Sequence, residues 1–475
     1  MRPISYGPIV VAVNKARSSA SRGRTTSLGL YAVAVIGCSS SSVMTEVVPC
    51  GAGDTGNALC DQVVRGKADF HDGALAGLGG NGRACSDCHM DADAFQLSPA
   101  DVEGRFQAMT ATGIDDPLFR AVDADDFDAN GAAANSYDNL RQNALVRVRL
   151  PLPGNIKLVD PATCVTDGVA AACDTSKTYA IATATFTDVW RAVPSVVNVK
   201  LTGRDAQTMA WPRGPNPQGG YQLDGRVDTL PNQAQGALTN HAETTTAADA
   251  ATLADIAAYE TSLLADPAPE LDSLQSTGKK VFDRACGQCH NGPGLARGQP
   301  GTPPQFMYGL ADDETSCPPP VDTASPPRWN LAPCPPSLAR NERTYEITFP
   351  DGAKQRRTTS DPGRALLSGY VDWAYVDPAS AACAHQPCGV PITDDWQKME
   401  VSPLHGISKT APYFHNNSAA TLEDVVEHYE EFYKHVAATD LPTPLPFVIS
   451  TDGIHADRPN VPAERDALVA YLKTL

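Results

Sequence analysis

Apolar residues recur at helical spacing in four stretches of the chain. Two of them, residues 60–84 and 271–285, run directly into a cysteine-containing motif. The other two, residues 251–264 and 463–475, follow much later and place residues such as Ile256 on one apolar helix face. The pattern predicts two copies of an early helix paired with a late helix, and therefore a mostly α-helical chain.

A proline-containing break separates the two copies. Asp266-Pro267-Ala268-Pro269-Glu270 ends the first late helix and is typical of a linker. We therefore predict one domain at residues 45–265 and another at 270–475, both enlarged by insertions. The proline-rich stretches at 300–304 and 318–336 are predicted to be loops.

The first residues have the pattern of an export signal. Basic residues precede a short apolar run at 28–36, which is too short to span a membrane. The run ends in small residues before Cys38, as in a bacterial lipoprotein cleavage site. We predict that residues 1–38 are a signal peptide and that a lipid on Cys38 anchors the chain on the periplasmic side of a bacterial envelope. The alternative is an ordinary signal peptide that contains a cysteine.

Charge narrows the choice of partners. The net charge is −18, which disfavours nucleic acid and would steer a small basic redox protein towards the surface.

Two C-x-x-C-H motifs carry the strongest chemical signal. They are Cys85-Ser86-Asp87-Cys88-His89 and Cys286-Gly287-Gln288-Cys289-His290. This motif is the signature of covalent haem c attachment. Cysteines three apart share one helix face and can reach both vinyl groups of a haem, while the histidine binds the iron. A redox disulfide or half of a zinc site is the alternative, and two copies in an exported chain disfavour it.

The remaining cysteines fall into sequence-local pairs, which we predict to be disulfides in an oxidising compartment. The pairs are Cys50 with Cys60, Cys164 with Cys173, Cys317 with Cys334, and Cys383 with Cys388.

A longer segment resembles a known family. Residues 402–423 contain Thr410-Ala411-Pro412-Tyr413-Phe414-His415 and Thr421-Leu422-Glu423. They resemble the "TAPYxH…TLEE" stretch of bacterial di-haem cytochrome c peroxidases, a superfamily that includes the MauG-type enzyme. The resemblance implies two cytochrome c-like domains with one covalent haem each.

The implied activity is reduction of hydrogen peroxide to water with electrons from a small redox protein, a cytochrome c or a cupredoxin. Peroxide would bind at the iron held by His89, and electrons would enter through the haem held by His290. A homodimer is compatible with the resemblance.

A looser match concerns the residues around the haem that would bind peroxide. Asp224-Gly225-Arg226 and Asn240-His241-Ala242-Glu243 resemble the family's distal stretch, which places Glu243 on its distal acid. A carboxylate there can accept and return a proton, and burial would raise its pKa towards neutrality. Glu243 as a solvated surface residue or a residue at a helix N-terminus is the alternative.

Two residues differ from those that the family has in this stretch. His241 replaces a proline, and a resting-state haem ligand, a second proton carrier and a surface residue all remain open for it. Leu223 replaces the family's tryptophan between the haems, and Trp211, twelve residues upstream, is a candidate substitute.

The sixth ligand of the second haem is a further question. The position of the family's methionine ligand falls on Tyr429, and the MauG-type enzyme has a tyrosine ligand there. A phenolate favours ferric iron and lowers the potential, whereas methionine raises it. His428, Met399 and Met307 are alternative ligands, and Tyr429 packed against haem or core is the structural alternative.

The segment also implies two supporting roles. Thr410 and Pro412 match positions whose carbonyls bind calcium. The asparagine that completes that site is missing, because residues 191–194 read Arg-Ala-Val-Pro. His415 is expected to support the second haem pocket by hydrogen bonding.

Two other functions remain open. The first is a MauG-like oxidase or oxygenase that acts on an organic or protein substrate through high-valent iron, and Tyr429 and Leu223 favour it. The second is a non-enzymatic di-haem electron carrier.

Overall fold

The computed structural model divides into two units, Met1–Val48 and Pro49–Leu475, and every residue described below belongs to the second. The described residues are 56–124, 137–158, 164–166, 169–171, 185–201, 221–266, 269–287, 290, 295, 306–307, 338, 341–369, 371, 395–429 and 462–475. The predicted signal peptide and Cys38 lie outside them.

Helices predominate among the regular elements. The helices are α1 (Ala58–Phe70), α2 (Pro99–Thr112), α3 (Asp138–Asn143), α4 (Leu230–Asn240), α5 (Ala250–Ser262), α6 (Ser273–Ala285), α9 (Ala365–Ser368), α11 (Pro462–Leu472) and a helical segment at residues 422–429. Short 3-10 turns include Cys85–Asp87 and Val199–Leu201. Within the described part, no helix has the length and apolar character needed to cross a membrane.

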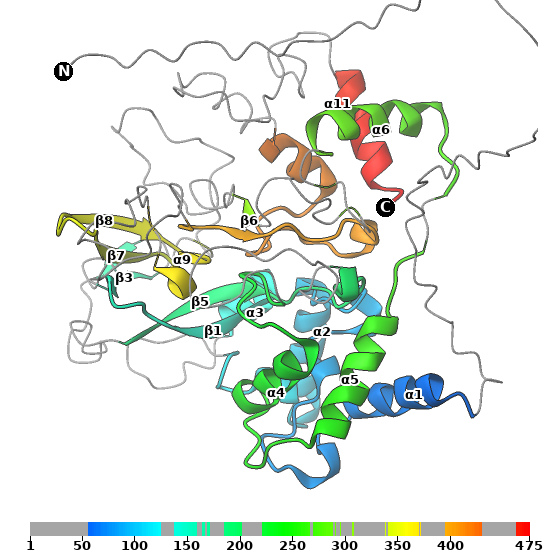
Figure 1. The fold of residues 1–475 in the computed structure, drawn as a ribbon, viewed down its shortest axis with the longest axis vertical. Helices are drawn as coiled ribbons and strands as arrows, with labels where there is room; N and C mark the ends of the chain where they lie inside the picture. The colour runs from blue at the N-terminus through cyan, green and yellow to red at the C-terminus, as the bar shows by residue number, and fades with distance from the viewer. Residues whose placement is uncertain are drawn as a thin grey trace, which may run out of the picture. The chain divides into compact units, whose positions relative to one another are not determined.

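Two helix pairs repeat the same close crossing (Figure 1), α1 with α5 and α6 with α11. A Cβ atom built on Gly66 of α1 would lie 1.8 Å from the carbonyl oxygen of Asp255 on α5. A Cβ on Gly278 of α6 would lie equally close to the carbonyl oxygen of Ala467 on α11. Only glycine lets the two backbones approach this far.

Aromatic rings continue the contact one turn later. The Phe70 and Tyr259 rings lie 5.3 Å apart at 65°, and the Phe282 and Tyr471 rings lie 5.4 Å apart at 61°. Both pairs have the edge-to-face geometry that aromatic rings prefer. The structure thus contains both pairs of an early and a late helix that the sequence predicted.

The predicted helices agree with the structure at 251–264, 271–285 and 463–475, but the helix predicted at 60–84 is wrong in length. It ends at Phe70. The chain beyond it contains Gly77, Gly79, Gly80 and Gly82, all with positive φ. That conformation is incompatible with a right-handed helix, so the segment before the first motif is a loop.

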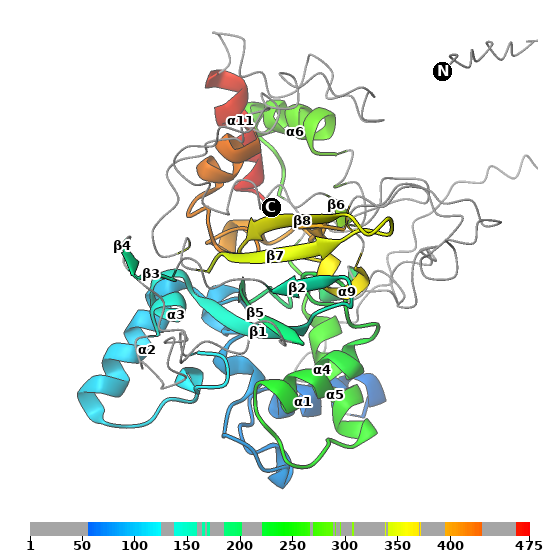
Figure 2. The same cartoon turned by 90° about the vertical axis from the view of Figure 1, so that its left-hand side faces the viewer.

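The insertions form small antiparallel sheets that the sequence analysis did not predict. Strand β1 (Leu145–Pro151) pairs with β5 (Phe186–Ala192). Strand β2 (Ile156–Leu158) pairs with β7 (Arg343–Thr348), which pairs with β8 (Lys354–Thr359) (Figure 2). Two-stranded pairs complete the set: β3 (Cys164–Thr166) with β4 (Val169–Ala171), and β6 (Phe306–Met307) with β9 (Met399–Glu400).

The three-stranded sheet joins the two sequence ranges predicted to be separate domains. Ile156 lies opposite Ile347 in the register of β2 and β7. Both side chains are buried, together with Tyr345 and Trp396. The regions of the two C-x-x-C-H motifs therefore share a core built from their insertions.

The glycine crossing gives a stability prediction. Gly66→Ala should lower the free energy of unfolding by about 1–3 kcal/mol or more, because the new methyl group meets backbone rather than a movable side chain. Gly104→Ala is the matched control, because Gly104 also lies in a helix, α2, but has open space around its Cβ position. Urea unfolding should show Gly104→Ala unchanged or more stable by up to about 1 kcal/mol. Equal effects of the two substitutions would contradict the close crossing.

Candidate cofactor site

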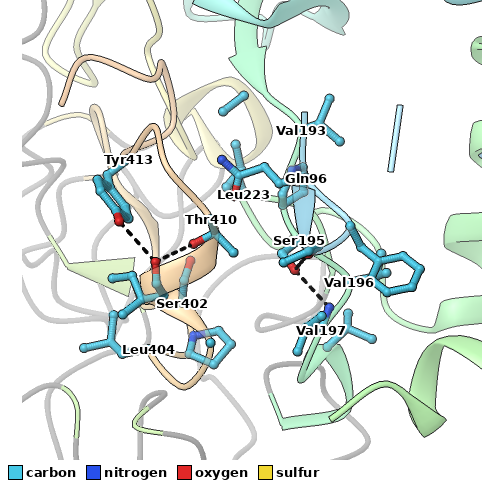
Figure 3. Close-up of a pocket in the computed structure, with 18 of the residues that line it drawn as sticks. Gln96, Val193, Ser195, Val196, Val197, Leu223, Ser402, Leu404, Thr410 and Tyr413 are labelled. Carbon is cyan, nitrogen blue, oxygen red and sulfur yellow. Dashed lines mark hydrogen bonds between the residues drawn. The ribbon is translucent and has the colours of Figure 1, made fainter. Parts of the chain in front are cut away.

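One cavity of about 1100 Å³ is lined by residues of both C-x-x-C-H motifs. Its walls include Cys85, Cys88 and His89 from the first motif and Cys286 and His290 from the second. Its volume lies slightly above the ~300–1,000 Å³ range of ordinary ligand pockets. Figure 3 shows part of its wall, where Gln96 and Ser195 face the segment that carries Ser402 and Thr410.

The two motif histidines have equivalent surroundings. His89 Nδ1 lies 3.1 Å from the carbonyl oxygen of Phe95, and His290 Nδ1 lies 2.8 Å from that of Leu295. A carbonyl can only accept, so Nδ1 must donate, and Nε2 is left as the nitrogen that can bind a metal. Both acceptor residues have positive φ, 61° for Phe95 and 57° for Leu295.

Phe70 and Phe282 lie one turn after the glycines of the two close helix crossings, and they pack near the motif histidine rings. The Phe70 and His89 centroids lie 6.1 Å apart, and those of Phe282 and His290 lie 6.4 Å apart. Burial lowers the pKa of His89 to about 4 and lowers that of His290 as well. Both imidazoles are therefore neutral at neutral pH, which is the form that binds iron.

The described motif cysteines are not cross-linked to other cysteines. Cys85, Cys88 and Cys286 are not in disulfides, and Cys289 lies outside the described residues. Burial raises the pKa of Cys85 and of Cys88 to about 12. Cysteines outside disulfides, beside a largely apolar cavity and a neutral histidine, fit a covalently attached haem at each motif.

A second internal repeat involves two other segments of the cavity wall, each with a tyrosine that lines the cavity. Tyr221 forms a β-bridge with Val227 shortly before α4, and Tyr413 forms one with Ala419 shortly before the 422–429 helix. Both helices then begin with a Thr-Leu pair, Thr229-Leu230 and Thr421-Leu422.

Tyr429 and Ala237 lie the same number of residues after these Thr-Leu pairs, so they occupy matching positions on the two helices. Both residues line the cavity. Tyr429 offers a phenol oxygen, whereas Ala237 has no atom that could bind a metal. The two sites therefore differ at this position.

The alternative ligands for the second haem are placed differently. Met399 lines the cavity, whereas His428 is buried beside the Phe414 ring, 4.5 Å away, and is not among the lining residues. The side chain of Met307 lies outside the described part.

His241 follows α4 and lines the cavity on the side of the first motif. Its Nδ1 lies 2.7 Å from Asp123 Oδ2. Arg83 Nη1 lies 2.5 Å from both carboxylate oxygens of Asp123 and also contacts the His241 carbonyl oxygen. Burial alone would raise the pKa of Asp123, but His241 and Arg83 outweigh it and lower the pKa. Asp123 is therefore an ionised acceptor that fixes the His241 ring with Nδ1–H towards it.

The structure places Glu243 away from this wall. Its side chain is exposed, and its Oε2 accepts a 3.0 Å hydrogen bond from Asn81 Nδ2. Glu243 is not among the lining residues, although His241 two positions earlier is one of them. The structure thus brings His241, but not Glu243, to the cavity.

Several hydrogen bonds join the two sequence ranges across the cavity wall. Gln96 Nε2 donates to the Pro412 carbonyl oxygen at 2.9 Å, and Ala192 N–H donates to the His415 carbonyl oxygen at 2.6 Å. Leu223 lines the cavity, and its carbonyl oxygen accepts from Glu400 N–H at 2.7 Å.

These contacts bear on the expected supporting roles. The Pro412 carbonyl already has a side-chain donor where calcium was expected. Within the described residues, no group of three or more histidine, cysteine or acidic side chains could hold a metal ion. His415 is buried and lines the cavity, and burial lowers its pKa to about 4.

A buried ionic network supports the same wall. Arg191 donates from Nε and Nη2 to Asp361, at 2.6 and 2.9 Å, and from Nη1 to Asp224 at 2.6 Å. Arg226 Nη1 also donates to Asp224. Arg191, Asp224 and Asp361 are each at most 2% exposed. Because Asp224 and Arg226 belong to the Asp-Gly-Arg motif, that motif joins the segment before α4 to β5.

The predicted disulfides are only partly described. Cys60 is disulfide-bonded, and its expected partner Cys50 lies outside the described residues. Cys164 begins β3, but its side chain is not described. The other five cysteines of the predicted pairs, Cys173, Cys317, Cys334, Cys383 and Cys388, lie outside the described residues.

No protein-family model and no curated protein matches the chain. Among solved structures, it is similar to a MauG-like protein associated with microbial copper homeostasis. That match has a TM-score of 0.40 and 16% identity and covers 87% of this chain and 88% of that one. It is also similar to the di-haem peroxidase BthA from Burkholderia thailandensis, with a TM-score of 0.35, 18% identity and coverage of 87% and 86%. A hydrazine synthase from Kuenenia stuttgartiensis matches with a TM-score of 0.30, 15% identity and coverage of 60% and 73%.

The ionic network gives a second stability prediction. Asp224→Asn should cost about 3–5 kcal/mol at pH 7, because it leaves Arg191 and Arg226 without one of their carboxylate partners. Asp283→Asn is the control, since it removes an exposed pair with Lys279 on α6 and should cost about 0.5 kcal/mol or less.

The same variant should change the acid dependence of stability. Burial alone would raise the pKa of Asp224, but Arg226 and Arg191 outweigh it and hold the pKa far below its ordinary value. The stabilisation is therefore present above the unfolded pKa of about 4 and is lost as the pH falls towards the depressed one. Urea unfolding of Asp224→Asn should show a shallower loss of stability below pH 4 than the wild type. An unchanged slope would contradict the paired, ionised Asp224.

Proposed function

We propose that the chain is an exported di-haem c-type oxidoreductase that reduces hydrogen peroxide with electrons from a small redox protein. The observation that carries the proposal is the single cavity lined by both C-x-x-C-H motifs, with His89 and His290 held identically through Nδ1. One haem c would be held by Cys85, Cys88 and His89, the other by Cys286, Cys289 and His290. When bound, haem iron supplies the electron-transfer chemistry by which a peroxide O–O bond is reduced to water.

The first site is the proposed reaction site, because its wall combines an open position with a proton carrier. Ala237 stands where the second site has Tyr429, so no side chain there competes with a small substrate. His241 is the proton carrier in place of Glu243. With Nδ1 held by Asp123, its Nε2 can accept a proton from peroxide and return it to the departing oxygen.

Asp123 is a positioning residue in this account. It fixes the ring and tautomer of His241 and stabilises the imidazolium that forms when Nε2 takes a proton. Arg83 keeps Asp123 ionised and in place through its own contacts to the carbonyl oxygens of Pro117 and Leu118.

The second site is the proposed electron relay, with Tyr429 as the sixth ligand. Tyr429 lines the cavity and packs with Phe414 and the core around Phe282. A phenolate ligand would give this haem a low potential. The acidic surface would attract a basic cytochrome c or cupredoxin as the donor.

A second candidate function is a MauG-like oxidation of an organic or protein substrate. Tyr429 on the cavity wall and Leu223 between the two ranges favour it. Rapid peroxide-dependent oxidation of a reduced cytochrome supports the peroxidase. Its absence, together with peroxide-dependent oxidation of an added organic or protein substrate, supports this rival. A protein that never binds peroxide or cyanide would be an electron carrier.

Substitution of the proton carrier should slow turnover. His241→Gln should lower kcat/KM for peroxide by about 10²–10⁴-fold. Asp123→Asn should lower it less and alter its pH profile, because the ring remains but loses its fixed tautomer. Glu243→Gln is the matched control and should stay close to wild type. Loss of turnover in Glu243→Gln with His241→Gln still active would overturn the assignment to His241.

The ligand of the second haem can be tested by low-temperature EPR of the oxidised protein. Tyr429→Phe should remove the sixth ligand and convert the second haem to a high-spin signal, and Tyr429→Met should raise its potential. Tyr413→Phe is the control, because Tyr413 also lines the cavity but its hydroxyl donates to the Ile407 carbonyl oxygen. If neither change at Tyr429 altered the second haem's spectrum, the ligand would be another residue.

A further inference from the structure

The cavity wall of the first site contains a buried carboxyl group, Glu260 of α5, that the proposed reaction does not use. Its side chain lies in the wall with only 4% of the residue exposed. Within the described part of the chain, its Oε2 makes no hydrogen bond. An unsatisfied buried carboxyl oxygen costs roughly 1–3 kcal/mol, so its position on a cofactor cavity calls for an explanation.

The helix-pair repeat shows what the other site has at this position. Asp255 and Tyr259 of α5 contact Gly66 and Phe70, as Ala467 and Tyr471 of α11 contact Gly278 and Phe282. The residue that follows the tyrosine is Glu260 in the first pair. In the second pair it is Leu472, which also lines the cavity and is buried. The fold therefore accepts an apolar side chain here, and the first site has an acid instead.

Among the described residues, no charged side chain balances Glu260. Burial raises its pKa to about 8 and is the sole cause of the shift. On α1, Arg65 pairs with Asp255, one turn away, and Asp69 also faces Asp255. Helix α4 contributes no charged residue, and Lys200 of the Val199–Leu201 turn does not contribute to the pKa shift of Glu260. The titratable group that senses Glu260 is the Cys85 thiol, which a thioether bond would abolish.

We propose that Glu260 is the redox-linked proton site of the first haem. The inference rests on the proposed attachment of that haem to Cys85, whose thiol is close enough to feel the Glu260 charge. A ferric haem carries one more positive charge than a ferrous haem. A carboxylate in this low-dielectric wall is therefore stabilised beside the oxidised form and takes up a proton when the charge is removed.

The step balances one electron against one proton. The electron comes from the donor protein and reduces the iron from ferric to ferrous. The proton comes from water and converts the Glu260 carboxylate to the carboxylic acid, so the net charge of the site is unchanged. Because protonation accompanies reduction, the potential of the first haem falls as the pH rises. A one-electron couple changes by at most about 59 mV for each tenfold change in proton concentration.

The test is a spectroelectrochemical titration of both haems in the holoprotein between pH 5.5 and 9. In the wild type, the potential of the first haem should fall with pH across this window. Glu260→Gln and Glu260→Leu should abolish that pH dependence and leave that of the second haem unchanged. The glutamine keeps the shape of the side chain, and the leucine reproduces Leu472. Glu270→Gln, an exposed site after α5, is the control and should behave as wild type.

A second measurement observes the proton directly. The reduced-minus-oxidised infrared difference spectrum of the wild type should contain a carboxylic acid C=O band that is missing in Glu260→Gln. If the first haem's potential retained its full pH dependence in Glu260→Gln, or if the infrared band persisted, Glu260 would not be the proton site. A wild type without two haems or without peroxide turnover would instead count against the proposed function, so the two failures are distinguishable.

Discussion

The structure depends on one constraint: two helix backbones that touch without an intervening side chain. Gly66 against Asp255 and Gly278 against Ala467 bring a late helix as close to an early helix as the chain permits. This contact fixes the phenylalanine one turn along, which lies near the motif histidine. It also fixes the residue after the paired tyrosine, which lines the cavity in both pairs. Packing between helices that are distant in sequence thus sets the geometry of the two proposed iron ligands.

Repetition of that unit makes the differences between the two sites informative. Ala237 and Tyr429 occupy matching positions, as do Glu260 and Leu472. At these matching positions the first site has a small side chain and an acid. The second site has a phenol and an apolar side chain there. The proposed function assigns the reaction to the first site and the electron relay to the second on the basis of these differences.

Much of this arrangement is readable from the sequence, because it is encoded locally. The C-x-x-C-H motifs, the Thr-Leu helix starts and the apolar faces at 251–264 and 463–475 each lie within a short window. The alternation Leu145-Val146-Arg147-Val148-Arg149 could also have indicated strand β1. The glycines after Phe70 could have indicated the early end of α1, and an alignment of the two halves could have paired Ala237 with Tyr429 and Glu260 with Leu472.

The features that the sequence does not predict depend on contacts between residues that are distant along the chain. Asp123 has no motif, and only the fold brings it to His241, with Arg83 behind it. The pairing of β2 with β7 joins residues on both sides of the predicted linker, and no local pattern encodes it. The choice between Glu243 and His241 was undecidable from spacing, because the two lie two residues apart and the left-handed backbone at Glu243 separates their directions.

The central claim is that each C-x-x-C-H motif carries one covalent haem, and intact-mass analysis of the denatured, exported protein tests it most directly. The account predicts a mass equal to the processed polypeptide plus two haems. Peptide mapping should place one haem on a peptide with Cys85 and Cys88 and the other on a peptide with Cys286 and Cys289. A mass without haem, or a Cys85–Cys88 disulfide in its place, would contradict the account.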